Sequence, residues 1–409
     1  MKICIILPRG FPPEIRVEKE ARTLLKEGHE LHLICIQKEY TQPLEELVQG
    51  IHVHRIKKPK RPFGKLSGLL TVEFFLNPIW TSKWENKIKE VIKEHGVDVL
   101  NVHDLPVAYT TIRTGKKYGI PIIFEMHENW PAALSAWGKS HIYDRLFMNV
   151  TLHKMLEKKC IKDADHILVV VDEQKKRLLK LNIPEKKITV VLNVEDINYF
   201  DKFLIDNALV SRYGGKFIIS YIGGIGPHRG VDTAIKSMPT VLKKIPNAKL
   251  LVVGAKGGKY VDTLKVLCVK LGIAHIVEFI DWVPFDKVPS YIAVSHVCLV
   301  PHHRSEHTET TIPHKLFQYM VMKKPVIVTD VAPLKRIVAD TKAGIVVLAG
   351  NPEKMSEAIV SLSSSERQRF FGEMGRKSAE KKYNWYFESK KLIRVYKKFA
   401  KHQKLKEHL

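Results

Sequence analysis

The fold of this chain is constrained most by a regular alternation of short, strongly apolar runs with longer amphipathic segments. The runs are rich in Ile, Val and Leu at nearly every position, which is typical of strands buried on both faces of a parallel sheet. Strands are predicted at residues 2–7, 31–36, 51–56, 98–102, 121–125, 166–171, 188–191, 217–222, 249–253, 276–280, 296–300, 325–328 and 344–348. Helical patterns lie between them, so the sequence predicts an α/β fold with helices on both faces of parallel sheets.

The length of 409 residues is too great for one ordinary hydrophobic core, and two domains are expected. No strand-rich or helix-rich block interrupts the alternation, which favours two Rossmann-like, doubly wound domains. A polar stretch at 211–216 precedes a new apolar strand. We therefore expect a first domain over residues 1–200 and a second over 201–383. Residues 384–409 have helical spacing and are predicted to form a long helix that packs back on the first domain.

The charge of the chain predicts an anionic partner. Lys and Arg number 67 against 43 Asp and Glu, a formal net charge of +24. Residues 55–93 mix cations with large aromatic side chains, which fits a surface lying on anionic lipid. These aromatic residues are Phe63, Phe74, Phe75, Trp80 and Trp84. A second basic cluster covers residues 376–406, for which a solvated, Lys-rich surface is an equal alternative. No nucleic-acid-binding motif is present, so no specific nucleic-acid partner is expected.

The cysteine and histidine residues predict neither disulfides nor a metal site. The five cysteines are odd in number, far apart and without redox-motif spacing, which favours reduced core cysteines in the cytoplasm. The 19 histidines include His302 and His303, but none has a spacing with carboxylates or Cys that is typical of metal ligands. No apolar run approaches the roughly 18 residues needed to span a bilayer. The apolar run at the N-terminus is too short for a signal peptide.

A glycine-rich loop at residues 223–230 (Gly-Gly-Ile-Gly-Pro-His-Arg-Gly) follows one predicted strand and precedes a helix. Glycines let a ligand approach the backbone, and a helix N-terminus offers free N–H groups to an anion. As a dinucleotide fingerprint the loop is weak, because Pro227 interrupts it and no acidic residue follows the next strand at Gly254. Arg229 can pair with phosphate, so the loop fits a diphosphate better. A simple strand–helix turn is the alternative.

A second ligand-binding pattern covers residues 306–330. A polar loop leads to Pro313, a residue suited to the first turn of a helix. Lys315 and Gln318 then lie three residues apart, on one face and near the positive end of the helix dipole. This combination suits a phosphate-bearing ligand with an attached sugar.

Together the two patterns resemble the donor half of the retaining glycosyltransferases of family 4 (glycosyl transferases group 1). Segments similar to that family also occur at residues 26–30, 193–200, 250–254, 279–284, 288–291 and 299–301. The resemblance implies the GT-B fold, in which two Rossmann-like domains face each other across a cleft. It implies that residues 1–200 form the acceptor-side domain and residues 201–383 the domain that binds the nucleotide-sugar donor.

The resemblance implies a diphosphate site around Arg229, which stands where the family has a basic residue for this group. Gly224 occupies the place of a second Arg that the family often has, so Lys315 is expected to be the second diphosphate cation.

It also implies the contacts to the rest of the donor. Gln318 stands where a Glu usually bonds the ribose, and Thr310 stands eight residues earlier, where an acidic residue is common. We expect these two, with Glu309 and Thr311, around the ribose and sugar. The nucleobase is expected near Gly254, Trp282, Val283 and Pro284.

In the first domain, the resemblance implies that His127 is catalytic, because family members place a His after this strand near the donor sugar. His103 and Asp104 follow the preceding strand, at the sheet edge where ligands bind in such folds, and are expected on the acceptor side. Arg16, at the start of the first helix, is expected there too.

The function that the resemblance implies is metal-independent transfer of a hexose-type sugar, with retention, from a nucleotide diphosphate sugar. The acceptor would be a hydroxyl of a lipid-linked or polysaccharide molecule. Arg229 and Lys315 would stabilise the departing diphosphate in place of a metal, and no cofactor is expected. The expected location is the cytoplasm, peripheral at the inner face of the membrane. The alternatives are a sugar-nucleotide epimerase or hydrolase of the same fold, and a basic nucleic-acid-binding protein without catalysis.

Overall fold

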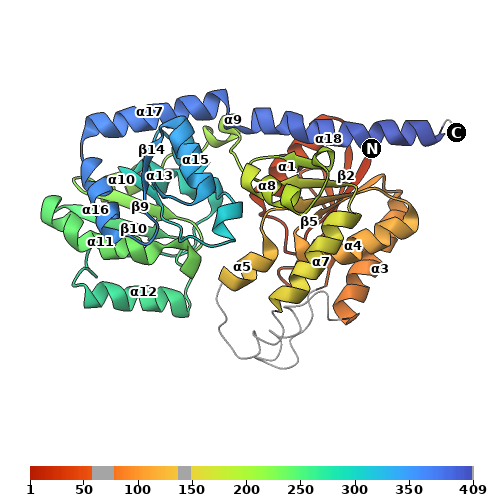
Figure 1. The fold of residues 1–409 in the computed structure, drawn as a ribbon, viewed down its shortest axis with the longest axis horizontal. Coiled ribbons are helices and arrows are strands. Elements are labelled where there is room, and N and C mark those ends of the chain that lie inside the picture. The colour runs from red at the N-terminus through yellow and green to blue at the C-terminus, as the bar shows by residue number, and fades with distance from the viewer. Residues whose placement is uncertain (58–77, 137–148, 408–409) are drawn as a thin grey trace. The chain divides into compact units, whose positions relative to one another are not determined.

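The computed structural model describes the backbone of residues 1–57, 78–136 and 149–407, and the side chains of 1–57, 81–136 and 149–400. The chain divides into two compact units, each built on one sheet (Figure 1). Unit 1 comprises Met1–Leu192 with Glu388–Leu409, and unit 2 comprises Asn193–Phe387. The sequence placed these boundaries after residues 200 and 383.

The sheet of unit 1 has eight strands in the order β3-β4-β2-β1-β5-β6-β7-β8. Their bounds are β1 Lys2–Ile6, β2 Glu30–Ile36, β3 Glu45–Val48, β4 Ile51–Ile56, β5 Val99–His103, β6 Ile122–Met126, β7 His166–Val169 and β8 Ile188–Val190. All neighbours are parallel except β3, which pairs with β4 in the antiparallel sense. Without β3, the order follows the doubly wound pattern, whose ligand crevice lies at the carboxyl ends of the strands where the order reverses, here between β1 and β5.

The edge strand β3 was not expected from the sequence. Gln49 and Gly50 form the two-residue turn of the β3–β4 hairpin, and both have the positive φ that such turns require. The strand is short and half polar, with the sequence Glu-Glu-Leu-Val, so it lacks the continuous apolar run that identifies the other strands. The expectation of an entirely parallel sheet was therefore wrong at this edge.

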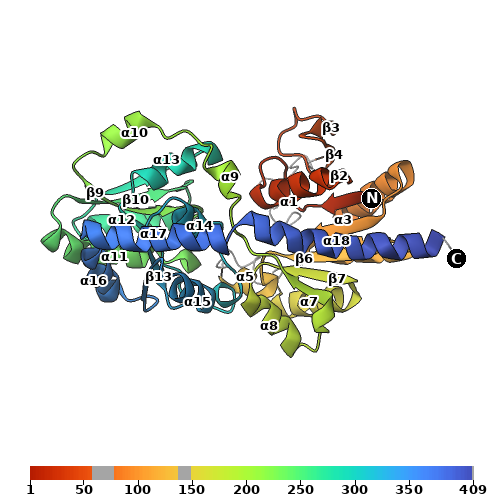
Figure 2. The same ribbon diagram turned by 90° about the horizontal axis from the view of Figure 1, so that it is seen from above.

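Helices cover both faces of the unit 1 sheet (Figure 1). Their bounds are α1 Ile15–Lys26, α3 Pro78–His95, α4 Leu105–Tyr118, α5 Trp130–Ala136, α7 Val150–Asp163, α8 Asp172–Lys180 and α18 Trp385–Glu407. In the figure, α3, α4 and α7 lie on one face and α1 and α18 on the other. Helix α8 packs beside α7, where Arg177 pairs with Glu157. Figure 2 shows α18 running along this unit. It is joined to the sheet by a hydrogen bond from Asn101 Nδ2 to the Tyr396 hydroxyl (2.9 Å).

Part of the basic, aromatic stretch at 55–93 faces the core. Trp84 is 1% exposed and packs with Ile88 and Val91 on the apolar side of α3, four and seven residues apart. Arg55 is buried and paired with Glu46. The expectation that Trp84 belongs to a lipid-facing surface was therefore wrong. Phe63, Phe74 and Phe75, and the side chain of Trp80, lie outside the described residues.

The sheet of unit 2 has six parallel strands in the order β11-β10-β9-β12-β13-β14. Their bounds are β9 Phe217–Ile222, β10 Ala248–Val253, β11 Val277–Ile280, β12 Val297–Val300, β13 Val326–Thr329 and β14 Gly344–Val347. This is the classic Rossmann order, and it reverses between β9 and β12. The expected α/β class with two doubly wound sheets is confirmed.

Helices also cover both faces of the unit 2 sheet, with α11, α12 and α16 on one face and α15 and α17 on the other (Figure 1). The helices are α9 Ile197–Phe200, α10 Asn207–Arg212, α11 Val231–Lys244, α12 Lys259–Lys270, α13 Val288–Ala293, α14 His314–Val321, α15 Ala332–Thr341, α16 Pro352–Ser361 and α17 Ser365–Lys381. Among the described residues, no helix is both long and apolar enough to cross a bilayer.

Candidate functional site

Three segments of unit 2 converge where its strand order reverses. The loop after β9 passes close to the end of β12, because a Cβ on Gly230 would lie 1.8 Å from the carbonyl oxygen of Pro301. Gly230 also has a φ of +67°, so only glycine satisfies both conditions at little cost. The third segment is α14, whose Lys315 ammonium lies so close to Gly223 that a Cβ there would meet it at 2.7 Å. The loop and the helix that carry the expected phosphate-binding residues are therefore neighbours.

Lys315 carries a buried amino group that has no anionic partner among the described residues. Its side chain is 8% exposed, and its ammonium has no hydrogen-bond partner in the part of the chain that the structure describes. The nitrogen lies 3.5 Å from the centre of the Tyr221 ring, a cation–π contact that only partly replaces lost hydration. Burial, with the Arg229 charge added, lowers the pKa of Lys315 well below its usual value. An anionic group beside this nitrogen would remove the cost of burying it.

Arg229 makes the same region more positive. Its Nη1 lies 3.3 Å from Nε2 of His302. Burial and then the Arg229 charge lower the pKa of His302 well below its usual value, and that of His228 to about 3. The buried ring nitrogens of His228 have no hydrogen-bond partner among the described residues. Arg229, Lys315 and the unpartnered imidazole of His228 form a site suited to a multiply charged anion.

The carboxylate of Glu309 is already engaged. One oxygen accepts a hydrogen bond from Arg304 Nε (2.8 Å), and the other accepts from the backbone N–H of Ala332 at the start of α15 (2.9 Å). The Thr310 hydroxyl donates to the carbonyl of Glu306 (2.8 Å). Thr311 is buried beside it in the chain. A sugar bound here would therefore meet a loop whose polar groups are largely satisfied within the loop.

Gln318 is paired with a carboxylate that the sequence did not single out. Its Nε2 donates to Oε1 of Glu195 (2.9 Å), and both side chains are buried. His314 Nδ1 lies 3.5 Å from the same oxygen. A carboxyl group therefore lies next to Gln318, the residue that stands where the family usually has a Glu.

The residues expected around the nucleobase lie at neighbouring strand ends. The Gly223 N–H donates to Val253 at the end of β10, and the Gly254 N–H donates to Ile280 at the end of β11 (both 2.9 Å). Trp282, two residues further on, is 63% exposed. Val283 is half-buried and Pro284 is exposed. An exposed indole at this edge is available to stack on a planar ring.

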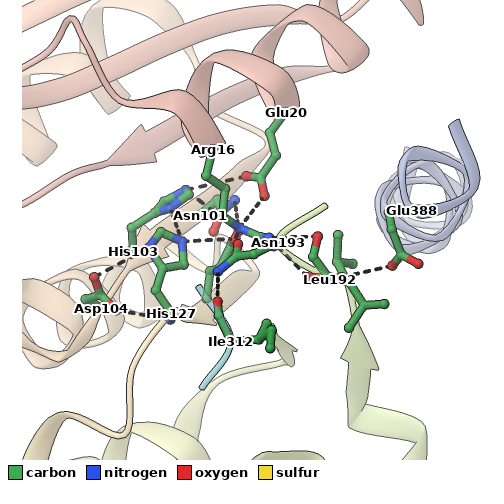
Figure 3. Close-up of polar contacts among 12 residues, drawn as sticks. Arg16, Glu20, Asn101, His103, Asp104, His127, Leu192, Asn193, Ile312 and Glu388 are labelled. Atoms are coloured by element: carbon green, nitrogen blue, oxygen red, sulfur yellow. Dashed lines mark hydrogen bonds and ion pairs between the residues drawn. The ribbon is translucent and has the colours of Figure 1, made fainter. Parts of the chain in front are cut away.

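Unit 1 carries a second polar network, where the strand order reverses between β1 and β5 (Figure 3). His103 is the last residue of β5, Asp104 follows it, and His127 follows β6. His103 Nδ1 and His127 Nε2 are 3.1 Å apart, and the backbone N–H of His127 donates to Asp104 Oδ1 (3.1 Å). The structure thus brings together three residues that the sequence assigned to catalysis and to the acceptor side.

A buried ion pair supports this network. Arg16 Nε donates to Glu125 Oε1 (2.5 Å), and Arg16 Nη1 donates to the carbonyl oxygen of Val191 (3.0 Å). Glu20 Oε1 lies 3.0 Å from the same Arg16 Nε. Arg16 is 1% exposed, so it positions Glu125 and does not present its guanidinium to solvent.

The pKa values of the two carboxyl groups in the network are shifted in opposite directions, and so are those of the two histidines. Burial, followed by repulsion from Glu125, raises the pKa of Glu20 well above its usual value. Burial acts on Glu125 too, but Arg16, His103 and His127 together outweigh it and lower the pKa well below its usual value. Burial lowers the pKa of His103 to about 4. For His127, burial is outweighed by Asp104 and Glu125, so its pKa is raised. His127 is therefore the histidine of this pair that holds a proton more readily.

His103, Glu125 and His127 also offer ligand atoms within 4.8 Å of one another, a spacing that a cation could bridge. Glu125 already holds the Arg16 guanidinium, which competes with any cation for the same oxygens. These residues come from two strands, so their proximity could not be read from their spacing in the sequence.

Two family models match the chain. Residues 14–198 match Glycosyltransferase Family 4, and residues 207–382 match Glycosyl transferases group 1. The chain belongs to glycosyltransferase family 4. This glycosyltransferase is 23% identical, over 97% of its own length and 98% of the relative's, to an uncharacterized glycosyltransferase of Methanocaldococcus jannaschii. It is 24% identical to the capsular polysaccharide biosynthesis glycosyltransferase CapM of Staphylococcus aureus, over 60% of this chain and 65% of CapM.

The fold of this glycosyltransferase matches that of sucrose-phosphate synthase from Thermosynechococcus elongatus. The TM-score is 0.81 at 16% identity, with 98% of this chain and 99% of that chain covered. The GT-B class expected from the sequence is confirmed, and so is the use of a nucleotide sugar by an enzyme of this family.

Three residues that line these sites were not singled out from the sequence: His228, Glu195 and Glu125. His228 lies in the glycine-rich loop at residues 223–230, next to Arg229, and its imidazole could have been identified from the sequence as a hydrogen-bonding group. Glu195 and Glu125 gave no such signal, because each acts through a partner more than 100 residues away, Gln318 and Arg16.

Proposed function

We propose that this glycosyltransferase transfers a sugar, with retention, from a nucleotide diphosphate sugar to a hydroxyl of a lipid-linked or polysaccharide acceptor. The observation that carries the proposal is the buried ammonium of Lys315, which lies close enough to Arg229 for that charge to lower its pKa and has no anion beside it among the described residues. A diphosphate between Arg229 and Lys315 would supply the missing negative charge.

The chemistry gives these two cations a role in the rate as well as in binding. When the bond between the sugar and the diphosphate breaks, negative charge grows on the departing diphosphate. Fixed cations in a site shielded from water stabilise that charge more than they stabilise the bound substrate. Loss of one such contact typically costs about 2–4 kcal/mol of transition-state stabilisation.

Around the rest of the donor we propose that Gln318, oriented by Glu195, bonds the ribose, with Thr310, Thr311 and Glu309 nearer the sugar. Gly224 is exposed and leaves the backbone open to the phosphates. The nucleobase would lie against the strand-end residues Gly254, Trp282, Val283 and Pro284. This half of the proposal uses residues of unit 2 alone.

Unit 1 would serve the acceptor and the transfer step. The resemblance to the family implies a catalytic role for His127. Its ring lies between two carboxylates, with Nε2 3.2 Å from Glu125 Oε1 and Nδ1 3.5 Å from Asp104 Oδ2, as in a positioned acid–base group. His103 and Arg16 would hold this group in place. Asp104, with Arg9 Nη2 donating to its Oδ2 (2.8 Å), would help to orient the acceptor.

The acceptor class is supported by CapM, whose name places it in capsular polysaccharide biosynthesis. We propose that the enzyme works in the cytoplasm, peripheral at the inner face of the membrane. Residues 58–77, at the centre of the proposed lipid-binding stretch, lie outside the described residues. Flotation with anionic vesicles at low salt tests the membrane claim, and absence of co-flotation contradicts it.

The activity is tested by incubating the enzyme with labelled nucleotide sugars, with and without glycolipid and polysaccharide acceptors. The proposal predicts label in the acceptor, with the anomeric configuration of the donor by NMR. Conversion of the nucleotide sugar at the same rate without any acceptor would instead indicate an epimerase or hydrolase.

A further inference from the structure

Four histidines gather in unit 1 away from the network just described. His32 lies on β2, His52 and His54 on β4, and His95 is the last residue of α3. The register pairs His32 with His52 and with Cys4 near the start of β1. The cluster therefore lies toward the amino ends of the strands, whereas His103 and His127 lie at the carboxyl ends.

Three of these histidines are arranged as a ligand set. His32, His54 and His95 each offer a ring nitrogen, and these nitrogens all lie within 4.8 Å of one another. His32 Nδ1 and His54 Nε2 are 3.0 Å apart, and the His95 ring centre is 4.3 Å from that of His32. A tetrahedral zinc ion bound to imidazole nitrogens at about 2.0–2.1 Å holds them roughly 3.3 Å apart. The 3.0 Å between His32 Nδ1 and His54 Nε2 is close to that spacing.

The outer nitrogens of two of the rings are held by carboxylates. His32 Nε2 lies 3.0 Å from Glu30 Oε1, and His54 Nδ1 is paired with Glu45. A carboxylate at one ring nitrogen is the usual outer partner of a histidine that binds a metal through its other nitrogen.

The inner nitrogens of His32 and His54 face each other at 3.0 Å. A metal ion between them would accept the lone pair of each nitrogen.

We propose that His32, His54 and His95 bind a zinc ion, with water in the fourth position. His95 has 33% of its side chain exposed, which gives the metal a path from solvent. The ligands come from β2, β4 and α3, so the ion would fasten the helix to this edge of the sheet. The site shares no residue with the networks assigned to sugar transfer.

The test uses untagged, full-length enzyme dialysed against a chelator and titrated with Zn²⁺ by calorimetry. The wild type is expected to bind Zn²⁺ at this site and to melt at a higher temperature with Zn²⁺ than without it. Co²⁺ in the same site is expected to give the strong visible absorption of a tetrahedral complex.

Three variants locate the site. His95→Ala is expected to weaken Zn²⁺ binding at least about 100-fold. Glu45→Gln is expected to weaken it by about 10–100-fold, because the Glu45 carboxylate holds the outer nitrogen of His54. His52→Ala is the matched control, because His52 stacks on the same His32 ring but is exposed and lies outside the ligand set. It is expected to bind as the wild type does. Melting curves without metal confirm that each variant is folded.

Three results would overturn the proposal. The first is no Zn²⁺ uptake by the wild type. The second is equal binding by folded His95→Ala. The third is loss of binding in His127→Ala with binding retained in His95→Ala, which would place the ion at the other histidine cluster.

Discussion

The ammonium of Lys315 lies 3.5 Å from the centre of the Tyr221 ring, in a buried position. The aromatic face offers weak compensation for the lost hydration of a full charge. Burying this amino group without an anion is therefore destabilising in the free enzyme, a cost that active sites often carry. This relationship makes separate predictions for stability and for activity.

Replacing Lys315 by Met, which keeps the length and removes the charge, is expected to stabilise the ligand-free enzyme and to lower kcat at least about tenfold. The stability gain follows because the pKa of Lys315 is lowered by folding. Thermal melts and sugar-transfer rates measure the two effects. Lys323→Met is the control, since Lys323 is exposed and paired with Glu373, and it should change neither. A variant less stable than the wild type, with full activity, would contradict the assignment.

His127→Ala is expected to lower kcat at least about tenfold and to leave the KM for the nucleotide sugar nearly unchanged. The reason is that His127 belongs to unit 1, whereas Arg229 and Lys315 belong to unit 2. Steady-state kinetics at varied donor concentration separate the two parameters. An unchanged kcat would remove His127 from the transfer step.

Arg16→Met is expected to destabilise the protein by about 3–5 kcal/mol, because it leaves the buried Glu125 without its cation. Glu125→Gln in the same background is expected to recover part of that loss. Denaturant unfolding of the two single variants and the double variant gives the coupling between the residues. Strict additivity would show that the ion pair does not act as a unit.

Acid is expected to destabilise the protein through buried neutral histidines. Burial lowers the pKa of His166 to about 4, with Lys398 and Lys187 adding to the effect. Between pH 6.5 and 4 the unfolded chain binds a proton at His166 that the folded chain does not, so the free energy of unfolding falls as the pH falls. His166 alone is expected to lower the free energy of unfolding by about 2–3 kcal/mol at pH 4.

Comparison of the wild type with His166→Gln tests this directly. The difference between their free energies of unfolding should change by about that amount between pH 6.5 and pH 4. It should be constant above pH 7, where the histidine is neutral in both states. A difference that stays constant across the whole range would show that His166 is not neutral in the fold.

Much of the fold was predictable because the parallel strands are continuous apolar runs, such as Phe217–Ile222 and Lys2–Ile6. The edge strand Glu45–Val48 was not, since half of its side chains are polar and its pairing depends on the turn at Gln49 and Gly50. Trp84 was misplaced because the charge of its surroundings was weighed above its helical spacing with Ile88 and Val91.

The residues of the candidate sites also differ in whether the sequence could reveal them. Arg229 and Lys315 could be found because each lies in a local pattern of loop and helix. The pairs Arg16–Glu125 and Gln318–Glu195 could not, because each depends on two segments that meet only in the folded chain. The His32, His54 and His95 cluster is hidden for the same reason, since its members come from two strands and a helix.

The most direct test of the central claim is calorimetric binding of UDP, GDP and ADP to the wild type, Lys315→Met and Lys323→Met. We expect one nucleotide diphosphate to bind the wild type and Lys323→Met with equal affinity, and Lys315→Met at least about tenfold more weakly. Equal affinity for all three proteins, or no binding by any nucleotide diphosphate, would contradict a diphosphate site between Arg229 and Lys315.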